Sequence, residues 1–523
     1  MEQALKRNEL AIKGSFIGII SQIITLLSKF IVRTFIIRYL GQEILGLDGV
    51  LIDTVNMLSL AELGITSAML YRLYTPVIQK DEKRINALMA SYRVIYHCIA
   101  VIISVLGICI SFLLPQIIKD ISVSWIHIYL AFYLQLISSV CSYLFAYQRI
   151  LLNADQKKTL CMIIDLFMEM VFSIAKVIAV VFFGSYTLYL LLAILQTAGA
   201  NIILLKYTQK HYSYIYKKTK YIKQDIQLIF SDAKDVLANK LASYVYTSTD
   251  NLIISIFLGT GIVGLLSNYK YLSLALRGMV NSTMSAMQPL IGNYLNSNVT
   301  KEQSYKTLKR YTFIRYVIAG STVVPFVVLS DTFVLLWTGN MSYIMPLAVT
   351  VFLAADYYIG CVYGPLGEYI FGMGLFKWGK YATLSCAVTN IVFSLIGVWK
   401  KGYLGVLAAT VLSEFVIWFA DGYIIFGKYY CNNMSYVMDY IKTHTLYIIQ
   451  VILSIVLSLW LTCFINFKNI WIQFVLGVVL SEIVFTGLLL VIHYHTDEFH
   501  YAKKLIIDLY KKIFIHRKIS KHG

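Results

Sequence analysis

The sequence predicts an all-α polytopic integral membrane protein of about fourteen transmembrane helices. Three observations lead to this fold class. The composition is 59% hydrophobic and only 14% charged, whereas a soluble domain needs roughly 25% charged residues to cover its surface. Apolar runs of about 20 residues, the length that crosses a bilayer core, recur along the whole chain. The chain has only six prolines, which suits long unbroken helices.

The predicted spans alternate with polar segments. The first apolar run follows a basic segment, is too long for the core of a signal peptide and has no small-residue cleavage site behind it, so it is expected to be a retained helix. Several spans exceed the length of a straight crossing, which implies tilt. The spans are expected at residues 15–38, 44–73, 92–114, 123–148, 160–182, 186–206, 235–258, 261–293, 311–337, 343–370, 380–399, 403–427, 445–464 and 470–493.

Lysine and arginine are distributed asymmetrically between the two sides of the membrane. The segments on the N-terminal side contain most of the 45 Lys and Arg residues. The opposite loops hold only Lys119, Lys400, Lys401 and Lys468. Cytoplasmic loops retain basic residues, so both termini are expected to be cytoplasmic. The net charge of +18 then faces anionic lipid headgroups, and nucleic acid is not expected as a partner.

A short motif occurs twice. Tyr39–Leu47 and Phe257–Leu265 share Leu, Gly, Ile, Gly and Leu at equivalent positions, and each follows the first predicted helix of its half. Chance matching among these common membrane residues is the alternative, but the equal place in the helix order favours duplication. An even number of helices per copy gives both copies the same orientation, which predicts a parallel repeat.

The repeat predicts the domain organisation. Two six-helix lobes are expected, followed by two further helices and an amphipathic tail that lies on the inner leaflet. The boundaries are 1–206 for the N-lobe (helices 1–6), 207–234 for a basic cytoplasmic linker, 235–430 for the C-lobe (helices 7–12), 431–493 for helices 13–14 and 494–523 for the cytoplasmic basic tail.

Two motifs resemble nucleotide-binding sites but lack the surrounding structure or residues that such sites need. Gly259–Gly264 matches G-x-G-x-x-G but lies in the outer turn of the repeat, and Gly374–Lys380 lacks the Ser or Thr of a P-loop at Tyr381. The eight cysteines are scattered without a C-x-x-C pair. No cofactor, metal site or catalytic residue is assigned. The short loops leave no room for a catalytic domain, so the chain is not expected to be an enzyme.

Charged residues within the predicted spans mark candidate functional positions, because a charge in the bilayer is costly unless it faces water or a partner. Lys29 and Arg33 on the first helix, with Lys270 and Arg277 on the eighth, are expected to form a cationic lumen. Such a lumen suits an anion, phosphate above all. Internal pairing, such as Arg33 with Asp250, is the alternative for each residue.

Further polar residues are candidates for lining the lumen or for ion coupling. Asp165 and Glu169 lie one helical turn apart on one face and could carry protons or sodium; a structural bridge from Glu169 to a neighbouring helix is equally open. The full set is Gln22, Asp48, Asp53, Glu62, Asp165, Glu169, Asp250, Asn281 and Arg315.

The chain resembles the multidrug/oligosaccharidyl-lipid/polysaccharide (MOP) exporter superfamily, and within it the polysaccharide-transporter (Wzx-type) flippases. The residues that carry the likeness are Arg38–Leu47 (RYLGQEILGL), Leu58–Ala68 (LSLAELGITSA) with Tyr71 after it, and Thr249–Ser255 (TDNLIIS). The resemblance spans both lobes, roughly residues 10–430.

This resemblance implies two lobes in a V that alternate between inward-open and outward-open states. It implies a cargo of undecaprenyl-diphosphate-linked oligosaccharide, moved from the inner to the outer leaflet of the bacterial cytoplasmic membrane for capsule, wall polymer or O-antigen assembly. A polysaccharide polymerase and glycosyltransferases are then expected partners, beside the lipid-linked substrate and membrane lipids.

Related lipid II flippases bind diphosphate through cations on helices 1, 2 and 8. Carried over by position, the resemblance implies this role for Lys29, Arg33, Lys270 and Arg277. The chain departs from that pattern in helix 2, which carries acids instead of a basic residue. The rival interpretations are a cation-coupled multidrug antiporter of the same superfamily, which should have an acidic and aromatic lumen, and a membrane polysaccharide polymerase, which should have a large extramembrane loop.

Overall fold

A computed structural model describes residues 2–58, 65–217, 219, 221–284, 291, 294–295, 299–373, 375–464, 469–505 and 507. These residues are almost entirely helical and include no strand, so the predicted all-α fold class is confirmed. The helices are α1 (Glu2–Tyr39), α2 (Gly41–Leu58), α3 (Ile65–Gln79), α4 (Glu82–Ser111), α5 (Leu114–Ile117), α6 (Trp125–Ala154), α7 (Lys158–Phe183), α8 (Tyr186–His211), α9 (Lys223–Leu258), α10 (Thr260–Met284), α12 (Lys301–Thr338), α13 (Leu347–Gly372), α14 (Phe376–Lys401), α15 (Tyr403–Ile424), α16 (Met434–Thr462) and α17 (Ile470–His493).

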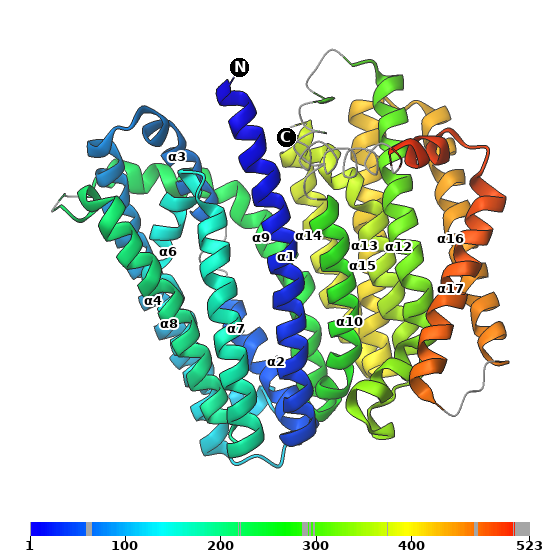
Figure 1. The fold of residues 1–523 in the computed structure, drawn as a ribbon, viewed down its shortest axis with the longest axis horizontal. Coiled ribbons are helices and arrows are strands. Elements are labelled where there is room, and N and C mark those ends of the chain that lie inside the picture. Colours follow the sequence, from blue (N-terminus) through cyan, green and yellow to red (C-terminus); the bar gives the residue numbers. More distant parts are fainter. Residues whose placement is uncertain are drawn as a thin grey trace, which may run out of the picture. The chain divides into compact units, whose positions relative to one another are not determined.

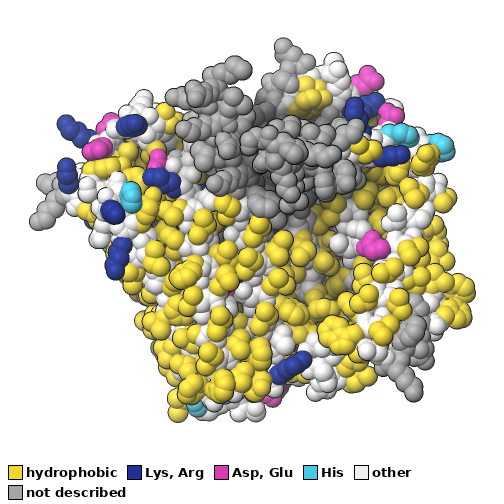
Figure 2. All heavy atoms as spheres, viewed as in Figure 1, with side chains coloured by type: hydrophobic (Ala, Val, Ile, Leu, Met, Phe, Trp, Pro, Cys, Tyr) yellow, Lys and Arg dark blue, Asp and Glu magenta, His cyan; other side chains and the backbone are white. Residues whose placement is uncertain are grey.

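Eleven helices among the described residues are long and apolar enough to cross a membrane, which makes the chain a multi-pass membrane protein. Hydrophobic side chains cover the middle of the helices in Figure 2, and the charged side chains in view gather mostly toward helix ends. The predicted spans 44–73 and 261–293 run into residues outside the described ranges, and of 235–258 only Ser248–Leu258 is counted, as a shorter apolar helix, so none of the three is among the eleven. They correspond to α2 with α3, to α9 and to α10, which carry several of the embedded charges.

The chain divides into two compact units. Unit 1 comprises Met1–Ser267 with Asn390–Val406, and unit 2 comprises Asn268–Thr389 with Leu407–Gly523. In unit 1, α6 packs on α4 and α8, while α1 packs on α7 and α2. In unit 2, α12 is central and packs on α13, α16 and α17 (Figure 1). Helix α9, expected to open the second lobe, packs within unit 1 against α2, α3 and α4; the predicted lobe boundaries stay a prediction.

The two copies of the repeated motif pack against each other within unit 1. An added Cβ on Gly46 would lie 2.3 Å from the carbonyl oxygen of Thr260. An added Cβ on Gly264 would lie 2.3 Å from the carbonyl oxygen of Gln42. Gln42 and Thr260 hold equivalent places in the repeat, so the contact is reciprocal. A reciprocal contact is what two copies related by a two-fold axis produce.

The linker between the predicted lobes is fastened to α4. The Arg84 guanidinium donates to both carboxylate oxygens of Asp225, at 2.8 and 2.7 Å. Asn86 donates to the Thr219 hydroxyl at 2.6 Å, and the Ile222 amide donates to the Ser91 hydroxyl at 3.2 Å. A bidentate Arg–carboxylate pair adds geometric specificity to charge. The beginning of α9 is therefore held in unit 1 by a fixed segment rather than by a loose tether.

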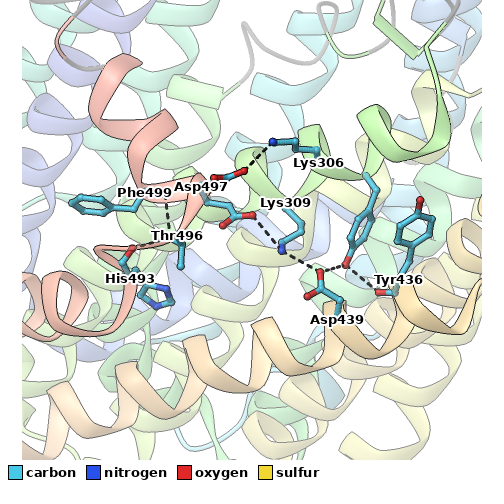
Figure 3. Close-up of polar contacts among 10 residues, drawn as sticks. Lys306, Lys309, Tyr436, Asp439, His493, Thr496, Asp497 and Phe499 are labelled. Atoms are coloured by element: carbon cyan, nitrogen blue, oxygen red, sulfur yellow. Dashed lines mark hydrogen bonds and ion pairs between the residues drawn. The ribbon is translucent and has the colours of Figure 1, made fainter.

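A second polar cluster fastens the segment after α17 to the beginning of α12 in unit 2. Lys306 forms an ion pair with Asp497 at 2.9 Å, and Lys309 forms one with Glu498 at 3.3 Å and another with Asp439 of α16 at 3.1 Å (Figure 3). The Lys306 ammonium holds the pKa of Asp497 below its usual value. Residues 497–505 are helical. Most of the predicted amphipathic tail lies outside the described residues.

Candidate functional site

Helix α1 carries two of the predicted cations, on one face of unit 1. Lys29 is exposed and makes no hydrogen bond or ion pair with any residue that the structure describes. Arg33 is half-buried and its Nη2 donates to the Ser267 hydroxyl of α10 at 2.5 Å. A spacing of four residues places both side chains on the same side of the helix.

A third cation, which the sequence-based set of binding residues did not include, joins this pair. Lys176 of α7 is 9% exposed, and its Nζ donates to the Gln196 amide oxygen at 2.6 Å. The Gln196 amide nitrogen in turn donates to the Glu169 carboxylate at 2.6 Å. Lys29 acts on Lys176 electrostatically. Lys176 follows Glu169 by two helical turns on one face, which is the sequence signal that could have drawn attention to it.

Asp48 of α2 lies beside these cations. Arg33 and Lys176 both act on its carboxylate electrostatically. Its Oδ1 accepts hydrogen bonds from the Tyr186 hydroxyl at 2.7 Å and from the Gln135 amide at 3.0 Å. The second carboxylate oxygen, Oδ2, accepts no hydrogen bond from the described part of the chain. Asp48 is therefore oriented by protein groups and keeps one oxygen available.

A cavity of about 440 Å³ opens next to Asp48, between α2, α6 and α8 of unit 1. Its volume is in the range of small-molecule pockets, roughly 300–1,000 Å³. Neutral polar side chains and tyrosines form much of its wall, and its one charged lining residue among those described is Asp48. The lining residues are Asp48, Ile52, Val55, Asn56, Leu134, Gln135, Ser138, Ser139, Ser142, Tyr143, Tyr189, Leu190, Ala193 and Thr197.

Other predicted acids of unit 1 are engaged by neighbouring helices. Asp53 accepts a hydrogen bond from Asn251 of α9 at 2.7 Å. Asp165 forms a bidentate pair with Arg149 of α6 at 2.7 and 2.8 Å. Glu169 is 9% exposed and bonds to Gln196 as described above. Asp250 of α9 is 5% exposed. The structure brings these acids into the helix packing rather than into the cavity lining.

The predicted cations of unit 2 differ in their surroundings. Lys270 of α10 is half-buried. Arg277 of the same helix pairs with Asp356 of α13 at 2.9 Å and with Glu414 of α15 at 3.4 Å, and it also donates to the Asp356 carbonyl at 2.7 Å. Two carboxylates therefore face one guanidinium. Convergence of the unit 1 and unit 2 cations on one lumen stays a prediction.

Arg315 of α12 is buried inside unit 2, with 3% of its surface exposed. Its guanidinium pairs with Glu368 of α13 and donates to the Tyr311 hydroxyl at 3.0 Å and to the Cys361 carbonyl at 3.2 Å. The Tyr311 hydroxyl donates to the other Glu368 oxygen at 2.6 Å. The Arg315 Nε has no partner among the described residues. The bonds of the other groups stabilise the packing of α12 on α13.

The remaining predicted residues add little to the site. Gln22 and Asn281 are exposed on α1 and α10. Glu62 lies outside the described residues. The described residues contain no group of three or more His, Cys, Asp or Glu side chains that could hold a metal ion.

Comparison of the sequence with known families gives a match over residues 11–295, to the family described as polysaccharide biosynthesis protein. The match spans more than half of the chain and includes the cations of α1, the cavity of unit 1 and Arg277. The chain belongs to the polysaccharide biosynthesis protein family. No protein with a curated description matches the chain.

Solved structures share the fold of this polysaccharide biosynthesis protein. The lipid II flippase MurJ in an inward-closed conformation aligns with a TM-score of 0.64 at 14% identity, over 92% of this chain and 99% of MurJ. An inward-facing multidrug resistance MATE transporter of the MOP superfamily aligns with a TM-score of 0.56 at 14% identity, over 76% and 92%. A mutant of the Vibrio cholerae MATE transporter VcmN aligns with a TM-score of 0.53 at 11% identity, over 81% and 98%. These structures share the fold that the resemblance to the MOP superfamily implied.

Proposed function

We propose that this family member is a flippase for an undecaprenyl-diphosphate-linked oligosaccharide, which it moves from the inner to the outer leaflet of the bacterial cytoplasmic membrane. The product would enter the assembly of capsule, wall polymer or O-antigen. The family description concerns polysaccharide biosynthesis, and a lipid II flippase has the same fold. Both support a lipid-linked cargo.

The observation that carries the proposal is the group of three cations in unit 1. Lys29 is exposed within a candidate membrane span and has no protein counter-ion among the described residues. Arg33 follows one turn later, and Lys176 lies within electrostatic reach on α7, where the carboxylates of Glu169 and Asp48 also act on it. A lysine within a span is costly unless it faces water or an anion. Because its charged neighbours include a cation, the missing anion is assigned to the substrate, and a diphosphate supplies it.

The second pair of cations has a different place in the proposal. Arg277 is already neutralised by Asp356 and Glu414. We therefore assign the diphosphate first to Lys29, Arg33 and Lys176, and we keep Lys270 and Arg277 as the second pair of the predicted cationic lumen.

The energy source is proposed to be the membrane potential or an ion gradient. Moving one negative charge outward from an electrically negative cytoplasm is favoured by about 2.3 kcal/mol per 100 mV. Of the two acids predicted for coupling, Asp165 is held by the Arg149 guanidinium, whereas Glu169 accepts hydrogen bonds from the neutral groups Gln196 and Ser173. We therefore favour Glu169 as the coupling acid. In vesicles, depolarisation should stop flipping while ATP is abundant; flipping that stops on ATP removal instead would require an ATPase partner.

The orientation of the chain follows from its basic segments, with both termini in the cytoplasm. Thr300 lies before α12 among basic residues, and Lys401 lies at the end of α14 in a loop predicted to face outward; both are exposed. A cysteine at 401 should react with a membrane-impermeant maleimide added to whole cells, and a cysteine at 300 should not. The reverse labelling would overturn the assignment.

The flippase proposal is tested in proteoliposomes with a fluorescent undecaprenyl-diphosphate-linked oligosaccharide, by measuring how much reaches the opposite leaflet. Lys29→Ala and Arg33→Ala should abolish flipping at unchanged protein level. Arg33→Lys should keep part of it, because the charge survives but the fork does not.

Lys158→Ala is the matched control, because it removes an exposed lysine at the beginning of α7 and should leave flipping unchanged. Normal flipping by the Lys29 and Arg33 variants would show that the cations are structural. Export of a cationic drug without movement of the lipid-linked oligosaccharide would show a multidrug antiporter instead.

A further inference from the structure

We infer that the cavity between α2, α6 and α8 is a binding site for an uncharged sugar of the substrate glycan. This inference rests on the proposed function, since it assigns a second part of the same substrate. The cations of α1 and α7 would hold the diphosphate, and the neighbouring cavity would hold a sugar attached to it.

Several polar groups line the cavity without protein partners. Asp48 Oδ2 accepts no hydrogen bond among the described residues, although Oδ1 accepts two. The amide oxygen of Gln135 is buried and has no partner there either. The Asn56 amide and the Ser138 hydroxyl also make no hydrogen bond to any described group. The Gln135 oxygen is a buried group of the kind that is normally paired, whereas Asn56 is exposed and Asp48 and Ser138 are half-buried. Together they offer donors and acceptors to a ligand in the cavity.

Tyrosine rings stand beside these polar groups. Tyr143 and Tyr189 both line the cavity. The Tyr189 ring is stacked with Tyr186 at 5.8 Å between centroids and 16° between planes, which fixes its orientation. A tyrosine offers an apolar ring beside polar surroundings. A pyranose has the same division, with apolar C–H faces and a rim of hydroxyls.

The charge of the lining selects against an anionic occupant. Asp48 is the one ionisable acid in the lining, and no lysine, arginine or histidine lines the cavity among the described residues. A diphosphate or a uronic acid would meet a carboxylate there without a cation from the lining. The diphosphate and the sugar are therefore assigned to different places, although Arg33 and Lys176 act on Asp48 from the side.

The volume favours an occupant larger than a bare cation. A cavity of about 440 Å³ has room for about fifteen water molecules, at roughly 30 Å³ each. A sodium ion would need several oxygen ligands drawn close together, whereas this lining spans two turns or more of each of three helices. A ring with several hydroxyls can reach groups that are spread in this way.

The test uses the full-length protein in detergent and measures the binding of free sugars by saturation-transfer NMR. The probes are glucose, N-acetylglucosamine and glucuronate. Ala193→Leu fills the cavity without removing a polar group, and it should weaken binding of both neutral sugars by about tenfold or more. Leu195→Ala is its control, because Leu195 is exposed on the same helix outside the cavity lining, and it should bind as the unaltered protein does. Glucuronate should bind more weakly than glucose.

Asp48→Asn separates recognition from folding, because a folding defect would weaken all probes alike. The substitution keeps an oxygen for the bonds from Tyr186 and Gln135 and removes the negative charge. Glucuronate binding should therefore improve relative to glucose. Glu82→Gln, at the exposed beginning of α4, should leave the ratio unchanged.

Several outcomes overturn the inference. The inference fails if no sugar binds, or if Ala193→Leu does not weaken the binding of neutral sugars. It also fails if Asp48→Asn does not raise the binding of glucuronate relative to glucose. Stabilisation by sodium that Asp48→Asn removes would show a cation site instead. The flippase proposal fails separately. If sugars bind as expected and the lipid-linked oligosaccharide is not flipped, the cavity is a glycan site of a protein with another activity.

Discussion

The cavity of unit 1 and the arginine network of unit 2 are both polar features within membrane-spanning helices, but they differ in how their polar groups are satisfied. In unit 2, both terminal nitrogens of Arg315 bond to Glu368, Tyr311 or a backbone carbonyl, and only its Nε has no partner among the described residues. In unit 1, Asp48 and Gln135 keep oxygens without partners among the described residues. The difference teaches that burial and charge alone do not identify a substrate site. Unpaired polar groups that line a cavity are better evidence.

Glycines explain how unit 2 can enclose its arginines. An added Cβ on Gly360 would lie 3.0 Å from Arg277 Nη2, and one on Gly364 would lie 2.1 Å from Arg315 Nη1. Both glycines lie on α13, one helical turn apart. The missing side chains let each guanidinium lie against the helix backbone, where it reaches carbonyl groups as well as carboxylates. The buried Arg315 of unit 2 therefore serves helix packing.

The largest effect is expected from breaking the unit 2 network. Arg315→Leu leaves Glu368 buried without its cation, and loss of one partner of a buried pair costs about 3–5 kcal/mol. The folded fraction in detergent, followed by size-exclusion chromatography and thermal unfolding, should fall sharply.

The double variant Arg315→Met with Glu368→Leu tests the same pair without an orphaned charge. It should recover most of the stability, because apolar replacement of a buried pair is often neutral. If Arg315→Leu unfolds at the same temperature as the unaltered protein, the network is not structural and the contrast between the units fails.

A smaller effect is expected where unit 1 is tightly packed, at the reciprocal contact of the repeat. Gly46→Ala and Gly264→Ala would each place a Cβ 2.3 Å from a backbone carbonyl oxygen. Overpacking of this kind typically costs about 1–3 kcal/mol. Because the contact is reciprocal, the two variants should lower the thermal midpoint by similar amounts. Gly49→Ala is the control on the same helix, since its Cβ would meet the nearest side-chain atom at 4.0 Å. If the two variants lose different amounts of stability, the two copies of the motif do not contribute equally to the packing of unit 1.

A third effect, smaller again, is expected at Gly364. Alanine there would press on Arg315, but a side chain can shift where a backbone cannot, so we expect a loss of about 1 kcal/mol, at the low end for overpacking. Gly367→Ala is the matched control on α13, because the nearest atom to its new Cβ, Asp421 Oδ2, would lie 3.7 Å away. Thermal unfolding in detergent measures both variants. Equal midpoints for the two would show that the glycine at 364 is not needed for the arginine.

Periodic and local patterns in the sequence were sufficient to predict the helices and the repeated motif. Apolar runs predicted the helices, and the repeated motif at residues 39–47 and 257–265 predicted two copies that the structure brings into contact. The pattern of polar residues on α6 was a usable signal for the cavity, since Gln135, Ser138, Ser139 and Ser142 follow one another at helical spacing. It was overlooked because these residues carry no charge.

The pairing of embedded charges could not be predicted in the same way. Whether Arg277 meets Asp356 and Glu414 depends on the rotation and depth of α10, α13 and α15, which lie far apart in the sequence. Helix periodicity predicts on which side of its helix a residue lies, but not which helix packs against that side. The same holds for Lys176, whose bond to Gln196 joins two neighbouring helices.

The smallest change in stability is expected for substitutions in the cavity itself. These variants give the sharpest test of the difference between the cavity of unit 1 and the arginine network of unit 2. Asn56→Ala and Ser138→Ala remove side chains that bond to no described protein group, so nothing is left unpaired by their loss. Their thermal midpoints should stay within the range of surface substitutions, about ±0.5 kcal/mol, whereas flipping of the glycan-bearing lipid should slow. Thr54→Ala is the control in the same region, since the Thr54 hydroxyl is buried and bonds within α2; it should change stability rather than flipping. A site preserved for a ligand and not for folding is expected to show this separation, because its hydrogen bonds form only when the substrate is present. Destabilisation by both cavity variants with unchanged flipping would place the polar groups of unit 1 in the same structural class as Arg315.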